Sequence, residues 1–142
     1  MDDEAWRAVY VAGLALHAGF QLTVTLLVYP GLAAFTPDGW QAGHARHSRL
    51  ITPVVVLVYA AALAGCAAGT THRAGLWGPA LAVSVAATLA AVGVTAAAAA
   101  PLHRRLADHD PALIARLLRV DRLRGAAAVV AAAAALLAVA IG

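Results

Sequence analysis

The sequence predicts an all-α protein in which four helices cross a lipid bilayer as one bundle. The chain of 142 residues is 63% apolar and only 12% charged, whereas globular chains are about 45–50% apolar and about 25% charged. The apolar residues gather into windows that reach or approach the roughly 20 residues needed to cross a bilayer as a helix. Four windows contain no Asp, Glu, Lys or Arg, namely Ala8–Pro37, Leu50–Thr71, Ala74–Leu102 and Gly125–Gly142. We therefore expect one integral membrane domain over residues 1–142, with spans at about 9–29, 50–70, 77–100 and 124–141.

The first span carries a polar stripe. His17, Gln21 and Thr25 are four residues apart and therefore share one face of a helix. Because an imidazole and an amide are costly to expose to lipid, this face should point into the bundle, where Tyr59 of the second span is a candidate partner. Two interpretations stay open. His17, Gln21 and Tyr59 contact a substrate, with His17 also able to carry a proton or act as a ligand, or they join helices through hydrogen bonds.

The first loop should contain a short amphipathic helix. Tyr29-Pro30 marks the point where the first span ends or bends, and Thr36-Pro37 is a good N-terminus with Thr36 as the N-cap. A helix from Pro37 onward would align four side chains along one stripe, namely Trp40, His44, His47 and Ile51. The indole of this stripe suits the membrane interface.

Small residues mark places where helices can approach closely in the second and third spans. Gly65 and Gly69 form a G-x-x-x-G pair, and Gly93–Ala97 is a similar pair. Such pairs permit close packing within this bundle or between copies in a homo-oligomer. The lone Cys66 excludes an intrachain disulfide and is expected to be a small apolar packing residue.

The third connection should hold a second amphipathic helix before the last span. Asp110-Pro111 again offers an N-cap and a first-turn proline. One face of the segment is apolar and another carries arginines. The apolar face comprises Leu113, Ile114, Leu117 and Leu118, and the basic face comprises Arg116, Arg119 and Arg122. The segment either lies along the membrane surface or is the end of one long helix that continues into the last span.

The basic residues predict an orientation. All ten are arginine, and eight of them fall in the first loop and the third connection. The positive-inside rule places these two loops in the cytoplasm and both termini outside the cell membrane. The basic loops should face anionic lipid headgroups, and no exposed basic and aromatic surface indicates nucleic acid as a partner. The acidic start, MDDEAWR, does not resemble a cleavable signal peptide.

Histidines are concentrated on the predicted cytoplasmic side. His44, His47, His103 and His109 should lie near the same depth. A His-x-x-His pair on a helix can present two imidazoles to one metal ion. No cysteine or glutamate accompanies these histidines, so we predict no metal site, and the sequence identifies no cofactor.

Three fragments together resemble a known family. They are YPGLAAF…GWQAGHARHSRLITPVV, PLHRRL and RLLRVDRLRG, and they are similar to the anthrone-oxygenase-like family of small four-helix bacterial membrane proteins. In that family the third helix ends in Pro-x-Asn/His-x-x-Leu, and the fourth begins near an Asn or Asp and an Arg. The matching positions here are Pro101, His103, Leu106, Asp121 and Arg124. The chain has His103 and Asp121 where an asparagine is expected.

The resemblance implies a four-helix membrane architecture and a site at the cytoplasmic rim. Some members are linked to oxygenation of polycyclic aromatic anthrones, which implies a lipophilic aromatic or quinone-like substrate. The implied catalytic residues are His44, His47, His103, Asp121 and Arg124.

Two functions from different classes therefore stay open. Asp121 and Arg124 are three residues apart on a helix and can pair, and an imidazole beside a carboxylate can act as a general base on an acidic C–H group or a phenol. The protein would then be a membrane-embedded enzyme of anthrone-oxygenase type. The same residues could instead be a structural clasp between the end of the third helix and the start of the fourth, in a multi-pass protein with an accessory role. A P-loop, a dinucleotide fingerprint and hydrolase arrangements are absent from the sequence.

Overall fold

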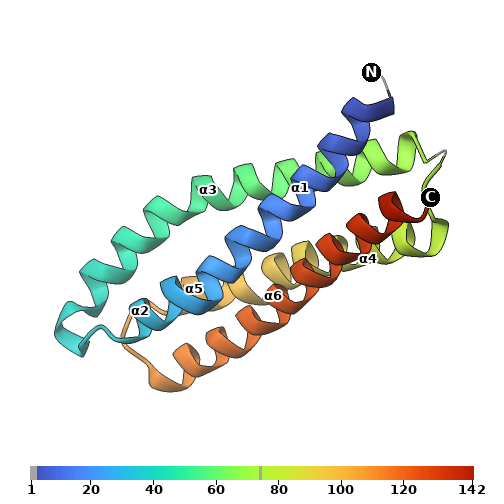
Figure 1. The fold of residues 1–142 in the computed structure, drawn as a ribbon. Helices are drawn as coiled ribbons and strands as arrows, with labels where there is room; N and C mark the ends of the chain where they lie inside the picture. The colour runs from blue at the N-terminus through green and yellow to red at the C-terminus, as the bar shows by residue number, and fades with distance from the viewer. Residues whose placement is uncertain (1–2, 74) are drawn as a thin grey trace.

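The computed structural model describes residues 3–73 and 75–142, and over these ranges the chain forms four helical rods and no strand (Figure 1). Two rods are single helices and two are interrupted by a π-helical turn. The first rod comprises α1 (Asp3–Thr23), η1 (Val24–Val28) and α2 (Tyr29–Ala33), and the second is α3 (Pro37–Thr71). The third comprises α4 (Gly78–Val94), η2 (Thr95–Ala99) and α5 (Ala100–Arg105), and the fourth is α6 (Pro111–Ala140). The all-α four-helix bundle is therefore confirmed.

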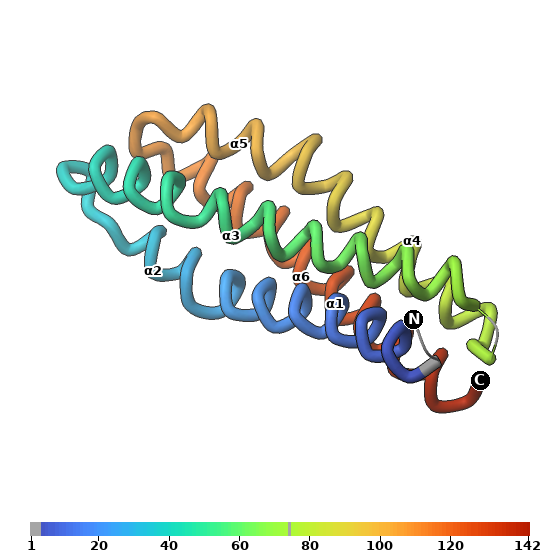
Figure 2. Tube along the Cα trace, turned by 90° about the horizontal axis from the view of Figure 1, so that it is seen from above, coloured from blue at the N-terminus to red at the C-terminus, as the bar shows by residue number. Residues whose placement is uncertain are grey.

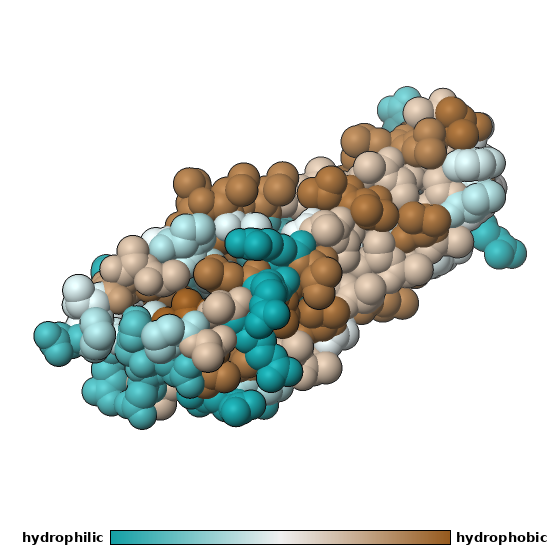
Figure 3. All heavy atoms as spheres, turned by 90° about the horizontal axis from the view of Figure 1, so that it is seen from below, coloured by the Kyte–Doolittle hydropathy of each residue, from teal (hydrophilic) through white to brown (hydrophobic). Residues whose placement is uncertain are grey.

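All four rods are long and apolar enough to cross a membrane. Leu16, Leu57, Leu89 and Leu136, one from each rod, are more than half exposed, which suits a lipid solvent and not water. Figure 3 shows apolar side chains over much of one face, with polar side chains gathered towards one end. The protein is thus a multi-pass membrane protein.

The rods run along one common axis, with the connections at the two ends (Figures 1 and 2). Both chain ends lie at one end of the bundle together with the connection between α3 and α4. We call this the termini end. The opposite end carries the connections from α2 to α3 and from α5 to α6, with eight of the ten arginines nearby in sequence. We call it the Arg-rich end.

Both predicted amphipathic segments are helical, but each runs without a break into the span that follows it. The 35 residues of α3 extend for about 52 Å at 1.5 Å per residue, well beyond the roughly 30 Å of hydrocarbon. Nothing in the sequence between residues 37 and 50 forces a break, and the helix tolerates Pro53 in its interior. Of the two predicted N-caps, Asp110 accepts hydrogen bonds from the backbone of Ala112 and Leu113, whereas the Thr36 side chain caps nothing.

A π-helical turn precedes a proline in both interrupted rods. In the first rod η1 ends just before Tyr29-Pro30, where the sequence predicts that the span ends or bends, and the helix continues beyond this point as α2. In the third rod η2 ends just before Ala100-Pro101. Proline lacks the backbone N–H that the preceding turn would use, and a wider turn accommodates this loss. Such π-helical turns occur frequently at functional sites.

Glycines on α1 and α3 let these two helices pack closely. A Cβ added at Gly13 would lie 2.5 Å from the Ala61 carbonyl oxygen, and one added at Gly65 would lie 3.0 Å from the Tyr10 carbonyl oxygen. A Cβ added at Gly69 would lie 2.8 Å from the Tyr10 ring. The Gly65–Gly69 pair therefore packs within one bundle, so this face is not available to a second copy.

Two apolar clusters hold the bundle together at different levels. Near the termini end, Tyr10, Leu14 and Leu81 pack against small residues of α6. Near the Arg-rich end the cluster comprises Val24, Tyr29, Leu32, Trp40, Leu102, Leu106, Ile114 and Leu117. Trp40 is only 1% exposed and donates a hydrogen bond of 3.1 Å to the Leu106 carbonyl oxygen. Its indole is therefore a core group and not the interfacial anchor that the sequence suggested.

Candidate functional site

Three of the four histidines at the Arg-rich end meet between α2, α3 and α5. His103 lies at the centre: its Nε2 is 2.8 Å from the Tyr29 hydroxyl oxygen, and its Nδ1 is 3.2 Å from His44 Nε2. The His47 ring stacks on the His103 ring with 5.8 Å between centroids. We call Tyr29, His44, His47 and His103 the histidine cluster.

The histidine cluster is arranged for proton transfer. If the Tyr29 hydroxyl donates to His103 Nε2, then His103 Nδ1–H donates to His44 Nε2, and the opposite tautomers reverse both bonds. His47 Nε2 is buried and has no hydrogen-bond partner among the described residues. The cluster therefore joins a phenol and two imidazoles in a hydrogen-bonded chain, with a third imidazole stacked beside it.

His109, the fourth histidine, lies apart from this cluster. Its ring meets the Trp40 indole edge-on, with 5.2 Å between the centroids. Over residues 3–73 and 75–142, no group of three or more His, Cys, Asp or Glu side chains is placed to hold a metal ion.

A buried charged network joins α1 to α6. Gln21 Nε2 donates to Asp121 Oδ1 at 2.8 Å, and Arg124 Nη2 donates to Gln21 Oε1 at 3.1 Å. The Arg124 and Asp121 side chains form an ion pair at 3.7 Å and are almost completely buried. We call Gln21, Asp121 and Arg124 the charged triad.

The charged triad connects a different pair of helices from the structural clasp that the sequence predicts. The sequence suggested that Asp121 and Arg124 tie the fourth helix to the third, but their hydrogen-bonding partner Gln21 lies on α1. The reason is that α6 packs extensively against α1 at this level, and Asp121 and Arg124 share that face. Among the described residues no hydrogen bond links Asp121 to an imidazole.

His17 and Tyr59 lie together further into the bundle. Their ring centroids are 4.6 Å apart, and the Tyr59 hydroxyl is 2.7 Å from Thr95 Oγ1 at the start of η2. His17 is completely buried, and neither ring nitrogen has a hydrogen-bond partner among the described residues. His17, Gln21 and Tyr59 therefore all face the interior, as the polar stripe predicted.

A cavity of about 420 Å³ lies between η1, α3 and the η2–α5 segment. Its walls are mostly apolar, and its polar lining includes Tyr29 and His103 of the histidine cluster and Arg124 of the charged triad. The full lining is Phe20, Val24, Tyr29, Ser48, Ile51, Thr52, Val55, Val56, Thr95, Ala99, Ala100, His103, Arg104 and Arg124. The cavity therefore connects two groups of residues that the sequence placed in one site.

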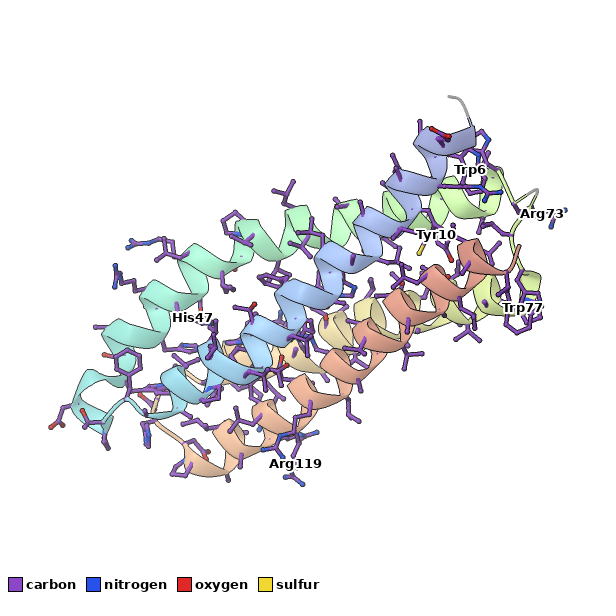
Figure 4. All side chains as sticks on the ribbon, viewed as in Figure 1. Trp6, Tyr10, His47, Arg73, Trp77 and Arg119 are labelled. Carbon is purple, nitrogen blue, oxygen red and sulfur yellow. The ribbon has the colours of Figure 1, made fainter. Side chains whose placement is uncertain are left out.

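Two residues that line this cavity each have a buried polar atom with no hydrogen-bond partner among the described residues. These atoms are Arg124 Nε and Ser48 Oγ. Buried polar groups are normally hydrogen-bonded, so an unpaired donor on a cavity wall is unusual. Figure 4 shows the His47 side chain on α3, while the Arg119 side chain points outward from α6.

Two residues of the site, Tyr29 and Ser48, are not among those that the sequence predicts. Tyr29 continues the stripe of His17, Gln21 and Thr25 at the same spacing of four, which was a usable signal. Because Pro30 follows it, Tyr29 predicts the end or a bend of the span and so does not stand out as a site residue. Ser48 has no such signal, since nothing in the local sequence indicates a cavity on that side of α3.

Comparisons of the chain with protein-family models, curated proteins and solved structures find no match. The resemblance to the anthrone-oxygenase-like family therefore stays a prediction.

Proposed function

We propose that this membrane protein binds a lipophilic aromatic molecule that carries carbonyl or hydroxyl oxygens, such as a quinone or an anthrone, in the cavity between η1, α3 and η2–α5. The observation that supports this most directly is the combination of apolar walls with two unpaired buried polar atoms, Arg124 Nε and Ser48 Oγ. An apolar ligand with oxygen atoms would cover the walls and accept hydrogen bonds from both groups.

The charge on Arg124 would orient such a ligand. Asp121 and Gln21 hold the guanidinium through its Nη atoms, which leaves Nε as the group available to the cavity. A carbonyl or phenolate oxygen that accepts from Nε gains a charge-assisted hydrogen bond, which is stronger than a neutral one. The charged triad would therefore act as a fixed anchor for the oxygen end of the ligand.

Entry from the lipid phase fits the packing of the rods. α3 packs extensively against α1 but much less against α4, on the side where the cavity lies. Two cavity residues on α3, Thr52 and Val56, are exposed on the outer surface. A ligand dissolved in the membrane would reach the cavity between α3 and the η2–α5 segment without crossing water.

The histidine cluster favours a catalytic role as a second candidate function. His103 lines the cavity and is hydrogen-bonded to both Tyr29 and His44. Because both ring nitrogens of His103 are engaged, the Tyr29 hydroxyl, which also lines the cavity, would take the proton from an acidic C–H or phenol group of the ligand and pass its own proton to His103 Nε2. The negative charge would then move to the ligand oxygen beside Arg124. With this role the protein would be a membrane-embedded enzyme of anthrone-oxygenase type, with His44, His47 and Asp121 as supporting residues.

The orientation belongs to the same proposal. With the Arg-rich end facing the cytoplasm of a cell membrane and both termini outside, the exposed arginines of α5 and α6 would contact anionic headgroups. The cavity would then open near the cytoplasmic edge of the hydrocarbon region.

Ligand titration of the purified protein in detergent tests this function. We would measure quenching of intrinsic tryptophan fluorescence by anthrone, a hydroxyanthraquinone and a short-chain quinone. Val55→Trp fills the cavity, whereas Val54→Trp adds the same side chain at a neighbouring position that is exposed and outside the lining. We expect saturable binding that Val55→Trp abolishes and Val54→Trp preserves. Equal binding to both variants, or no saturable binding to the wild type, would contradict the proposal.

A further inference from the structure

The buried polar side chains of the bundle form one column along its axis. Near the termini end, the Tyr10 hydroxyl is hydrogen-bonded to Ser84 Oγ, and Thr88 lies one turn further along α4. Next come His17 with Tyr59, then the charged triad, and finally the histidine cluster. In a chain that is 63% apolar, this alignment places titratable or hydroxyl groups at every level of the interior.

The steps of this column are short. His17 is seven residues after Tyr10 on α1, and Thr88 is four after Ser84 on α4, which correspond to about 10 Å and about 6 Å along the helix axes. Because Tyr10 and Ser84 are at one level, Thr88 and His17 differ in level by only about 4–5 Å. Beyond His17, the Tyr59 ring lies within 4.6 Å of the imidazole, and its hydroxyl contacts Thr95. Gln21 of the charged triad is four residues after His17 on α1, or about 6 Å along the helix axis, and Arg124 lines the same cavity as His103. Internal water molecules would bridge the remaining gaps.

Packing of the helices does not explain why a histidine is buried at position 17. It is completely buried in the spanning part of α1, yet both of its nitrogens have no hydrogen-bond partner among the described residues. A histidine that served only to join helices would donate or accept at least one hydrogen bond across the bundle. Unpaired buried polar atoms are normally satisfied by internal water, which typically makes about three hydrogen bonds.

We propose that His17 accepts and releases the transferred proton at the middle of a proton relay. This relay runs through the bundle between the histidine cluster and the termini end. A proton arriving at one ring nitrogen gives an imidazolium, and loss of the proton from the other nitrogen leaves the neutral ring in its other tautomer. Reorientation of the ring or the reverse transfer restores the first tautomer, so the net change is movement of one proton. Ionisable side chains inside membrane spans commonly serve in such relays.

The charges around His17 permit this transfer. Arg124 is close enough to interact electrostatically with His17 and with His103, and its positive charge alone would oppose an imidazolium. Asp121 is paired with Arg124 at 3.7 Å, so its negative charge offsets part of the charge of the guanidinium.

The relay has an approach at each end. At the Arg-rich end, Tyr29, His103 and His44 are already joined by hydrogen bonds. At the termini end, Trp6 lies beside the partly exposed His72, whose ring stacks on the indole with 5.8 Å between centroids. His72 follows the last residue of α3 and is three residues after Gly69, which packs on the Tyr10 ring.

Proton flux into liposomes that contain the purified protein tests the relay. Vesicles with internal potassium, valinomycin and the pH-sensitive dye pyranine would receive an external acid pulse. We expect the wild type to acidify the interior about tenfold faster than protein-free vesicles, and both His17→Leu and His17→Gln to return to the protein-free rate. His17→Gln keeps a polar side chain but cannot carry a proton as a cation, so it separates proton transfer from packing.

His109→Gln is the matched control, because His109 lies outside the column against Trp40, and it should keep the wild-type rate. Circular dichroism would confirm that each variant is helical before reconstitution. A wild-type rate equal to that of protein-free vesicles, or a His17→Leu rate equal to that of the wild type, would overturn the relay. Either result leaves ligand binding in the cavity untouched, because that binding is measured separately in detergent.

Discussion

The charged triad gives the sharpest energetic prediction. Asp121→Leu removes the carboxylate that accepts from Gln21 at 2.8 Å and pairs with Arg124 at 3.7 Å. At 3.7 Å the attraction between the two charges is about 4 kcal/mol for an effective dielectric constant near 20. Loss of one partner of a buried ion pair typically costs about 3–5 kcal/mol, because the other charge is left buried and unpaired.

The double variant Asp121→Leu/Arg124→Leu should recover most of this loss. Replacement of both charged groups by apolar side chains of similar size is often neutral or stabilising, since neither charge then has to be buried. Each single variant should lose about 3–5 kcal/mol, whereas the double variant should lose only about 1–3 kcal/mol. The coupling free energy between the two positions should therefore be at least about 3 kcal/mol. Gln21 would keep one unpaired amide in the double variant, at a cost of about 1–3 kcal/mol.

The assay is SDS-induced unfolding in mixed micelles, followed by circular dichroism at equal protein concentrations. The four proteins of the cycle are the wild type, both single variants and the double variant. If the two single losses simply add in the double variant, the ion pair has no energetic role in the fold and the reasoning fails. If the double variant is stable but binds no ligand, the triad is retained for the cavity and not for stability.

Two further predictions concern packing and capping. Gly13→Ala should destabilise the bundle by about 1–3 kcal/mol, because its Cβ would lie 2.5 Å from the Ala61 carbonyl oxygen. Gly93→Ala, whose Cβ meets open space inside α4, should instead stabilise the bundle by about 0.5–1 kcal/mol. Thermal unfolding of both variants checks this, and an equal effect of the two substitutions would show that α1 and α3 are not in close contact. Asp110→Ala should lower the free energy of unfolding by about 1 kcal/mol, because it removes an N-cap that accepts two backbone hydrogen bonds. Thr36→Ala should change it little, because that side chain caps nothing. The same unfolding assay measures both variants, and a larger loss for Thr36→Ala would contradict the account.

The fold could be predicted from the sequence because the membrane limits the choices. Uninterrupted apolar windows admit only helices, and the polar stripe of His17 and Gln21 can only face inward. The same logic failed for Trp40, which looked like an interfacial anchor but is buried. The reason is that α3 extends beyond the hydrocarbon and forms its own core there with Leu106.

The candidate site was harder to predict because it depends on which rods pack together. The sequence predicts that His103, Asp121 and Arg124 lie at a similar depth in the membrane. Depth can be predicted well, because it follows from the position of a residue relative to the ends of the apolar windows. The sequence does not show that α6 packs on α1. Because of this packing, Asp121 is hydrogen-bonded to Gln21, and His103 is hydrogen-bonded to Tyr29 instead of to Asp121. The cavity could not be predicted from the sequence either, because it results from weak packing between α3 and the third rod.

Photoaffinity labelling in native-like lipid would test the central claim most directly. A quinone analogue with a photoreactive group would be activated in liposomes that contain the protein, and labelled peptides would be identified by mass spectrometry. The account predicts saturable labelling at cavity residues such as Ile51, Val55 and Ala99, with loss of labelling in Arg124→Gln and in Val55→Trp. Labelling spread over lipid-facing residues such as Leu89 and Leu136, with no saturation and no effect of either variant, would contradict it.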